Sequence, residues 1–357
     1  MALLYIDGFD LQDTTMRWVT SGNTGEIVYT TPTRFGGGKA ATLNSTTNTT
    51  ILSILRSFTP AASVYMGAAV QVGLESGNSS DPTGNLFGVY GDNGTTGHIY
   101  LRRLSTNALV VYRGDANAGS LGSPSGTQIA TSAAGTLDGN WHYIEMFATI
   151  NATTGQVIVK VDGTQVINFT GNTKNGGTST NIDALRFRTG KYFNNPNAVI
   201  SLDDLYICDA TGTVNNTFLG DVRVQSMVPN AAGSSTQLTP TGSANNYANA
   251  GESPYNDATY NASSTVGQRD TYALSDLIAN TTTIFGVQSV AHMQKSDAGV
   301  ANAKVALKSG ASVYYDNTQS LGSTATAYTQ VRETDPATSA AWTVGNANNL
   351  EAGMEVA

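Results

Sequence analysis

The fold class is decided by the stretch Gln156-Val-Ile-Val-Lys-Val-Asp-Gly-Thr-Gln-Val-Ile-Asn-Phe169. Valine occupies every second position from Val157 to Val161, and this alternation predicts a strand with one apolar face. Asp162-Gly163 then separates this run from a second one, Gln165–Phe169. Asp-Gly between two such runs favours a type I′ turn, because both central residues need positive φ. The stretch therefore predicts a β-hairpin.

Similar short runs of aromatic and β-branched residues, bounded by Gly, Asn, Asp, Ser and Thr, recur along the chain and predict further strands. These runs are Tyr65–Val72, Leu86–Tyr90, His98–Leu104, Ala108–Arg113, Trp141–Thr149, Leu185–Arg188, Ile200–Ile207, Asp221–Met227, Thr283–Met293, Ala303–Lys308, Ser312–Tyr315 and Ala327–Glu333. Helical periodicity is limited to Ile51–Phe58 and Leu274–Ala279, each long enough for one or two turns. We therefore predict an all-β protein.

The length of 357 residues suggests about two domains at ~150 residues each. The sequence becomes polar between Asp209 and Asn216, so we place a linker at residues 211–220. It would separate a domain of residues 1–210 from a smaller C-terminal β-sandwich of residues 221–357. Pro229–Asp257 is long, small and polar, which predicts a loop or an arm on a neighbouring subunit. This feature is the first indication that the protein assembles with other subunits.

Composition excludes several classes of function. The formal net charge is −8, which repels a phosphate backbone and argues against nucleic-acid binding. A single cysteine excludes an intrachain disulfide and a CxxC site. No run approaches the roughly 18–20 apolar residues of a membrane span. Residues 1–6 are too short for a signal peptide and Arg17 is the first basic residue, so we expect a protein assembled in the cytoplasm.

Candidate metal ligands are few. The chain has three histidines, none of them at zinc-ligand spacing. Asp92 and Asn93 lie in a glycine-rich turn with Asp81 nearby in sequence, and their oxygen atoms suit a speculative Ca²⁺ site. The alternative is a hairpin tip in which Asp and Asn serve turn geometry. We expect no cofactor other than Ca²⁺.

Catalytic patterns are absent from the sequence. A retaining glycosidase needs two carboxyl groups about 5–5.5 Å apart. Asp203 and Asp204 are adjacent, so on a regular strand they would point to opposite faces. Gly122–Gly126 reads Gly-Ser-Pro-Ser-Gly, which is not a nucleophile elbow. We therefore predict no catalytic residues and no enzymatic activity, with a polysaccharide depolymerase or glycosidase as the alternative.

Aromatic residues are the remaining candidates. Exposed tyrosines stack on sugar faces, and flanking Asn and Asp side chains bond to hydroxyl groups. Tyr90, Tyr100, Tyr112 and Tyr192 are members of such a surface, or else belong to core and cross-strand packing. The candidate glycan-binding residues are Tyr90, Asp92, Asn93, Tyr192 and Asn194.

Trp141-His142-Tyr143-Ile144, followed by Val159-Lys160-Val161-Asp162-Gly163, resembles the laminin-G/concanavalin A-like jelly roll. In that superfamily a Trp-His strand precedes a strand that ends in a Val-Asp-Gly turn. Ser201–Ile207 is similar to its closing strand. The resemblance covers roughly residues 1–210 and implies a lectin-like jelly-roll domain there.

A second resemblance is to bacteriophage virion proteins. It is carried by Leu4-Tyr-Ile-Asp-Gly-Phe-Asp10, by 217–224, by Gly267–Asp270, and by Glu333–Pro336 with Ala341-Trp342-Thr343. It implies a non-enzymatic structural component of a phage particle, of the minor tail, tail fibre or decoration type. Such a protein would contact other virion proteins and a host-surface glycan, and would reside in the virion as a homo-oligomer, with a trimer favoured. The low charged content of 12% agrees with a surface that packs against neighbours.

Overall fold

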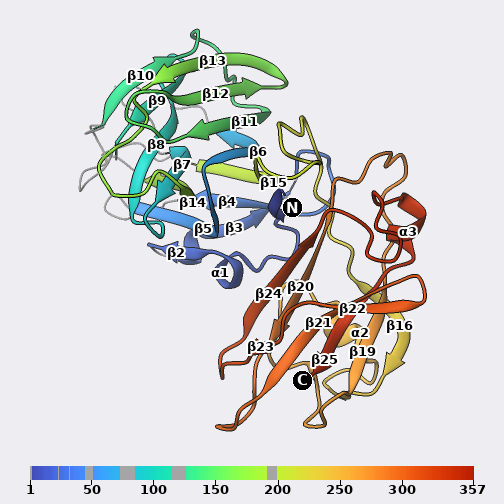
Figure 1. The fold of residues 1–357 in the computed structure, drawn as a ribbon. Helices are drawn as coiled ribbons and strands as arrows, with labels where there is room; N and C mark the ends of the chain where they lie inside the picture. The colour runs from blue at the N-terminus through green and yellow to red at the C-terminus, as the bar shows by residue number, and fades with distance from the viewer. Residues whose placement is uncertain are drawn as a thin grey trace. The chain divides into compact units, whose positions relative to one another are not determined.

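The computed structural model describes residues 2–22, 24–31, 33–44, 51–72, 85–114, 126–190 and 199–357. Strands dominate these residues, so the predicted all-β fold is confirmed. The chain forms two compact units (Figure 1). Unit 1 comprises Met1–Asp10 and Trp18–Val224, and unit 2 comprises Leu11–Arg17 and Gln225–Ala357. Residues 211–220, expected as a linker, thus group with unit 1.

The first sheet of unit 1 has eight antiparallel strands in the order β13-β12-β11-β6-β15-β4-β3, with β1 also paired to β15. The strands are β1 Leu3–Asp7, β3 Ile27–Thr30, β4 Ala40–Asn44, β6 Ser63–Val72, β11 Trp141–Thr149, β12 Gly155–Val161, β13 Thr164–Gly171 and β15 Val199–Asp209.

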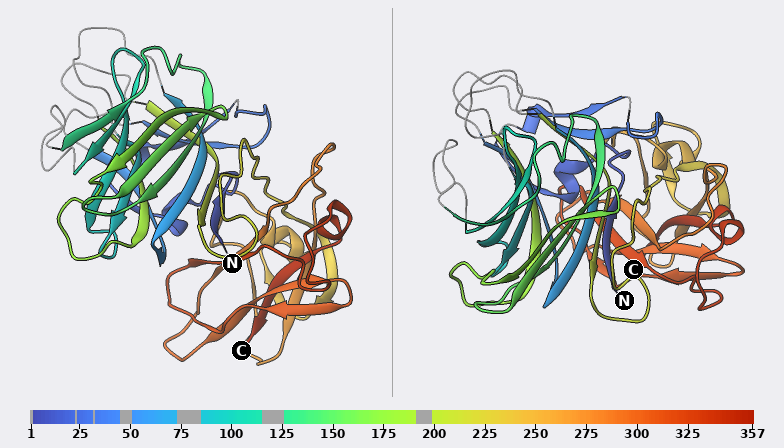
Figure 2. Two further views of the ribbon diagram at one scale, coloured as in Figure 1. Left: turned by 45° about the horizontal axis from the view of Figure 1, so that its top comes forward. Right: turned by 90° about the horizontal axis from the view of Figure 1, so that it is seen from above.

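The second sheet of unit 1 has seven antiparallel strands in the order β10-β9-β8-β7-β14-β5-β2. They are β2 Val19–Ser21, β5 Ile51–Ala61, β7 Asn85–Gly91, β8 Thr96–Arg103, β9 Leu109–Arg113, β10 Thr127–Thr131 and β14 Ile182–Gly190. A short 3₁₀ turn, η1 Thr24–Glu26, precedes β3. The two sheets lie face to face in the views of Figure 2.

The core of unit 1 lies between its two sheets. Along β12 the burial alternates, with Val157 and Val159 fully buried and the residues between them half-buried. These valines belong to the same apolar cluster as Phe87 of β7 and Phe187 of β14, which come from the opposite sheet. Burial of both inner faces therefore makes unit 1 a β-sandwich.

The predicted hairpin is confirmed and explains the Trp-His motif. Asp162 and Gly163 have φ of 48° and 79°, as a type I′ turn requires. The Asp162 carboxylate accepts a hydrogen bond from the Tyr143 backbone N–H at 2.8 Å and lies 2.7 Å from His142 Nδ1. His142 Nε2 lies 2.9 Å from the Asp138 carboxylate. The histidine therefore ties the hairpin turn to the start of β11.

Unit 2 is built on a six-stranded antiparallel sheet in the order β16-β19-β25-β21-β22, with β23 also paired to β21. Two two-stranded ribbons, β17-β18 and β20-β24, accompany it. The elements of unit 2 are α1 Thr14–Arg17, β16 Pro229–Thr236, β17 Thr239–Thr241, α2 Asn246–Ala250, β18 Tyr260–Ala262, β19 Arg269–Leu274, β20 Val287–Met293, β21 Asn302–Ser309, β22 Ser312–Tyr315, β23 Gln319–Ser320, β24 Thr326–Arg332, α3 Val344–Asn348 and β25 Glu351–Val356.

The core of unit 2 lies between the β20-β24 ribbon and the large sheet. Met293 of β20 packs with Val305 of β21, and Tyr328 of β24 and Met354 of β25 lie against them. A second cluster joins Leu307, Trp342 and Leu350. The ribbon thus covers one face of the sheet, which gives unit 2 the two-layered form expected of a sandwich.

Several predicted elements were wrong. Ile51–Phe58 is part of strand β5 because its neighbours β14 and β2 pair with it along its length. The residues after Leu274 form no helix, and Asp221–Met227 forms no strand. The expected loop Pro229–Asp257 contains β16, β17 and α2, with β16 paired to β19. Local composition misled at these places because pairing partners decide them.

Candidate functional site

Strand register gathers tyrosines and arginines on the outward face of the seven-stranded sheet. Arg186 of β14 pairs with Gly88 of β7, and Gly88 pairs with Tyr100 of β8. Tyr100 in turn pairs with Tyr112 of β9. Residues directly opposite each other across an antiparallel pair point to the same face. None of these side chains belongs to the inter-sheet core, so the row crosses the outer face.

Neighbouring rows extend this surface. Arg188 pairs with Asn85, and Asn85 pairs with Arg102 of β8. Ala184 pairs with Tyr90 on the other side of the first row. We call the resulting surface the arginine–tyrosine face; its residues are Asn85, Tyr90, Tyr100, Arg102, Tyr112, Arg186 and Arg188.

Contacts within the arginine–tyrosine face hold its side chains in place. The Arg186 guanidinium carbon lies 4.3 Å from the centre of the Tyr90 ring, and Arg186 Nη1 donates a hydrogen bond of 3.0 Å to the Tyr90 hydroxyl. The Tyr90 and Tyr100 rings meet edge to face at 5.7 Å. Both rings pack with Leu55 and Ala184. Cross-strand packing, the alternative reading of these tyrosines, therefore does describe Tyr90 and Tyr100.

Asn85 and Arg186 have buried polar atoms on this face without a hydrogen-bond partner. Asn85 is 1% exposed, and neither its side-chain oxygen nor its nitrogen accepts or donates a hydrogen bond. The Nε atom of Arg186 is also buried without a partner. A buried polar group left unsatisfied costs about 1–3 kcal/mol, and such groups are rare in folded proteins. A ligand that bonds to these atoms would offset this cost.

The arginine–tyrosine face gathers several of the chain's arginines. In the described strands, the register places no Asp or Glu on it, although the whole chain has 26 acidic against 18 basic residues. Three of those basic residues, Arg102, Arg186 and Arg188, lie on this side of the sheet, where Arg186 is half-buried and Arg102 and Arg188 are buried.

The predicted site residues have different outcomes. Tyr90 lies on the arginine–tyrosine face. Asp92 lies in the β7–β8 turn, where its Oδ1 accepts from the Ser179 backbone N–H at 2.9 Å, and this bond is the leading cause that lowers the pKa of the carboxyl. The Asn93 backbone N–H donates to Asp183 Oδ2 at 2.7 Å. Asp92 and Asn93, with φ of 54° and 59°, thus hold the loop before β14 and shape the turn.

The other predicted site residues, Asp81, Tyr192 and Asn194, lie outside the described residues. Within the described ranges, no group of three or more His, Cys, Asp or Glu side chains is arranged to hold a metal. The calcium site stays a prediction.

Sequence reasoning missed Asn85, Arg102, Arg186 and Arg188. One signal was present: Arg186 and Arg188 are two apart, so a strand places both on one face. Nothing in the sequence indicated Asn85 as a site residue, because its place on the face depends on its pairing with Arg188 and Arg102.

Asp203 and Asp204 form a second polar cluster, on the outer face of the eight-stranded sheet. They were expected on opposite faces, but a register irregularity in β15, with Asp204 at φ 53°, leaves Leu202 and Leu205 in the core and both carboxyls outside it. Burial, with the charge of Asp204, raises the pKa of Asp203 to about 8, and burial raises that of Asp204 to about 6.

The chain itself supplies hydrogen bonds to these carboxyl groups, although Asp204 Oδ2 is buried without a hydrogen-bond partner and lies 3.8 Å from Arg34 Nη1. Asp204 Oδ1 accepts from the Val224 backbone N–H at 2.7 Å. Nearby, Glu145 Oε1 accepts from the Gly220 N–H at 2.9 Å and from the Tyr206 hydroxyl at 2.5 Å. The cluster therefore fastens residues 217–224 onto the sheet, and Asp203 and Asp204, 6% and 2% exposed, do not meet solvent.

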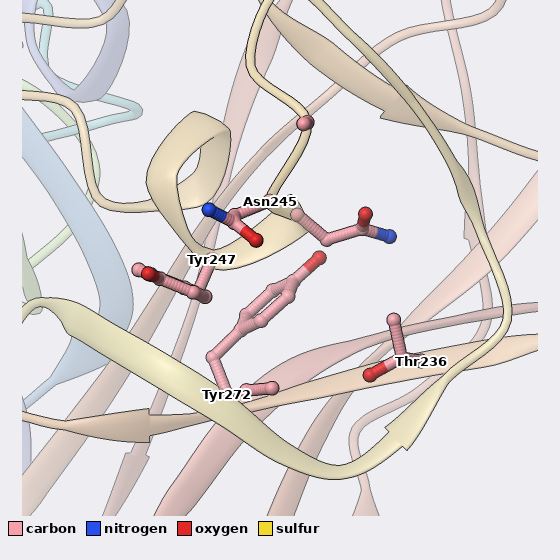
Figure 3. A pocket seen from close by; sticks show the side chains of 7 residues that line it. Thr236, Asn245, Tyr247 and Tyr272 are labelled. Atoms are coloured by element: carbon pink, nitrogen blue, oxygen red, sulfur yellow. The ribbon is translucent and has the colours of Figure 1, made fainter.

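A small pocket of about 100 Å³ lies in unit 2. Figure 3 shows Tyr272 between Tyr247 and Thr236, with Asn245 above it. The Tyr272 hydroxyl already donates to Asp270 Oδ2 and accepts from Asn261 Nδ2, both at 2.9 Å. The volume is below the roughly 300 Å³ of ordinary ligand pockets. The arginine–tyrosine face is therefore the stronger candidate site.

No protein-family model matches the chain, and no curated protein matches it. Similar solved structures include an alginate lyase from a Chlorella virus, at 12% identity and a TM-score of 0.40, covering 58% of this chain and 98% of that one. A galectin-like protein from Bacillus subtilis has 10% identity and a TM-score of 0.37, covering 58% and 96%. A sialidase has 11% identity and a TM-score of 0.37, covering 57% of this chain and 18% of that one. These likenesses concern the fold and assign no function to this chain.

The comparisons correct one expectation. We expected no enzymatic activity because catalytic patterns are missing from the sequence; this expectation is contradicted, since the structures that share the fold include enzymes, namely alginate lyases and a sialidase. Separately, none of the helices in the described part of the chain has the length and apolar character to cross a membrane.

Proposed function

We propose that unit 1 binds a glycan through the arginine–tyrosine face. The observation that carries the proposal is the Asn85 side chain, buried on this face with both polar atoms unbonded. A carboxamide offers one acceptor and two donors, which match the hydroxyl groups of a sugar. Half-buried Tyr112 adds an aromatic ring at the edge of the face, where a sugar ring can stack.

We further propose that the chain is a structural component of a bacteriophage particle. The support is the sequence resemblance of Leu4–Asp10, 217–224, Gly267–Asp270 and Glu333–Pro336 to phage virion proteins. In this role the protein is a homo-oligomer, with a trimer favoured, that contacts other virion proteins and resides in the virion. The glycan face would then meet the host surface.

Glycan binding is tested with a glycan array and with calorimetry on the wild-type chain and Tyr112→Ala. We expect binding by the wild type and at least tenfold weaker binding by the variant, because the sugar ring loses its stacking contact with the Tyr112 ring while the fold persists. Tyr314→Ala in unit 2 is the matched control and should bind like the wild type. Chromatography of the same mixtures detects any saccharide release. No binding to any glycan would overturn the proposal.

The particle role is tested separately. Native mass spectrometry should show an oligomer, and antibodies against the chain should label purified particles. A monomer that is absent from particles would refute the structural role and leave the glycan proposal standing.

A further inference from the structure

We infer that the glycan bound by the arginine–tyrosine face carries carboxylate groups, and that Arg186 is the residue that binds them. This inference rests on the proposed function and names the class of ligand at the same site. A uronate-type sugar combines the features required: a ring for half-buried Tyr112, hydroxyl groups for Asn85, and a planar anion for the guanidinium.

The first argument is the orientation of Arg186. Its Nη1 atom donates to the Tyr90 hydroxyl, and its guanidinium lies over the Tyr90 ring. These two contacts fix the plane of the group, and on the edge formed by Nε and Nη2 the Nε atom is buried without a hydrogen-bond partner. That edge carries two parallel N–H groups, the arrangement that binds both oxygens of one carboxylate.

The second argument is electrostatic. Arg186 makes no ion pair with a carboxylate in the described part of the chain; its described partners are the ring and hydroxyl of Tyr90. A partly buried cation without a counter-charge is costly, and an anionic ligand would remove that cost. Arg188 and Arg102 lie on either side of Asn85 in the register.

The third argument concerns the shape of the anion. A bidentate contact to a planar guanidinium edge favours a planar carboxylate, and half-buried Tyr112 on the same face favours an anion attached to a sugar ring. A sulfated glycan offers the same charge on a tetrahedral group. It is therefore the competing ligand to be tested.

The experiment compares four polymers by calorimetry with the full chain: polygalacturonate, the same polymer with its carboxyl groups reduced, dextran sulfate and dextran. We expect polygalacturonate to bind at least tenfold more tightly than its reduced form and than dextran sulfate. Raising the salt concentration should weaken binding of polygalacturonate, because a charged contact is screened.

The variants assign the effect to Arg186. Arg186→Gln should weaken binding of polygalacturonate at least tenfold and change binding of the reduced polymer little, with Arg186→Lys intermediate because it keeps charge without the planar fork. Arg113→Gln is the matched control: Arg113 lies on β9 of the same sheet but pairs with core-facing Ile99, so it points away from the face. Tyr90→Phe keeps the ring and removes the hydroxyl that orients Nη1, and it should weaken binding severalfold.

The outcomes separate the two proposals. Equal binding of native and reduced polygalacturonate, or an unchanged affinity in Arg186→Gln, overturns the carboxylate inference and leaves glycan binding intact. Equal or tighter binding of dextran sulfate also overturns it. If Arg186→Gln fails to fold, Tyr90→Phe and the polymer comparison still decide. If the chain binds none of these polymers and no other glycan, the proposed function itself fails.

Discussion

Asn85 is the residue whose structural and functional roles predict opposite results. Its side chain is buried and unbonded, so it destabilises unit 1 when no ligand is present. Asn85→Leu, which has a similar shape, should therefore raise the free energy of unfolding by about 1 kcal/mol while abolishing glycan binding. Thermal unfolding and calorimetry measure the two effects. A variant that is less stable than the wild type would show that Asn85 serves the fold.

Asp203 predicts an unusual dependence of stability on pH. Its pKa in the folded protein, raised to about 8 by burial and by Asp204, is far above the ordinary value, so the folded state holds a proton that the unfolded state releases. The stabilising effect is complete below pH 4, and it is lost as pH rises from there to 8. Asp203→Asn keeps the oxygen that accepts from the Asp204 N–H and removes the charge.

We expect Asp203→Asn to be more stable than the wild type at pH 8 by at least about 1 kcal/mol, the equivalent of one pKa unit, and similar to it at pH 4. Urea unfolding at a series of pH values measures this difference. Asp221→Asn, on a half-exposed carboxylate, is the control. A difference between variant and wild type that does not change with pH would refute the assignment.

At the scale of elements, the β12–β13 hairpin depends on His142. Burial lowers the pKa of His142, but hydrogen bonds to Asp162 and Asp138 outweigh burial and raise it overall, and the pKa of Asp138 falls to about 2. The imidazolium form therefore stabilises the hairpin below pH 6.5, and this contribution disappears as pH rises through the raised pKa. His142→Gln should remove this step in a plot of melting temperature against pH. Because both carboxylates are more than half exposed, the step should be below about 1 kcal/mol.

The elements also show which parts of the fold and site the sequence could predict, and why it could not predict the others. The valine alternation and Asp162-Gly163 specify the hairpin because their information is local. Ile51–Phe58 could not be identified as a strand, since a short apolar run suits a helix turn equally and its partner β14 begins more than a hundred residues later. The arginine–tyrosine face could not be predicted for the same reason: Asn85 and Arg188 pair only through a register that the sequence does not display. Tyr90 was proposed from the sequence because its residue type alone indicates stacking.

At the scale of the whole molecule, the chain passes between the two units three times, after Asp10, after Arg17 and after Val224. The short segment Leu11–Arg17 belongs to unit 2 although unit 1 residues flank it on both sides. Its anchor is Asp13, whose side chain is 0% exposed and accepts from Arg17 Nε at 2.6 Å and from His292 Nε2 at 2.8 Å. A residue near the N-terminus is therefore part of the C-terminal unit.

This arrangement predicts that Asp13→Ala weakens unit 2 and spares unit 1. The substitution leaves Arg17 without its carboxylate in a buried place, and breaking a buried ion pair on one side costs about 3–5 kcal/mol. Differential scanning calorimetry of the full chain should show one transition moved to lower temperature and the other unchanged. Asp138→Ala, which removes an exposed carboxylate of unit 1, is the control and should leave the unit 2 transition unchanged. Hydrogen exchange of Asp13→Ala should locate the loss of protection in β20 and β24. An equal shift of both transitions would mean that the two units unfold as one, so that the division into units has no thermodynamic counterpart.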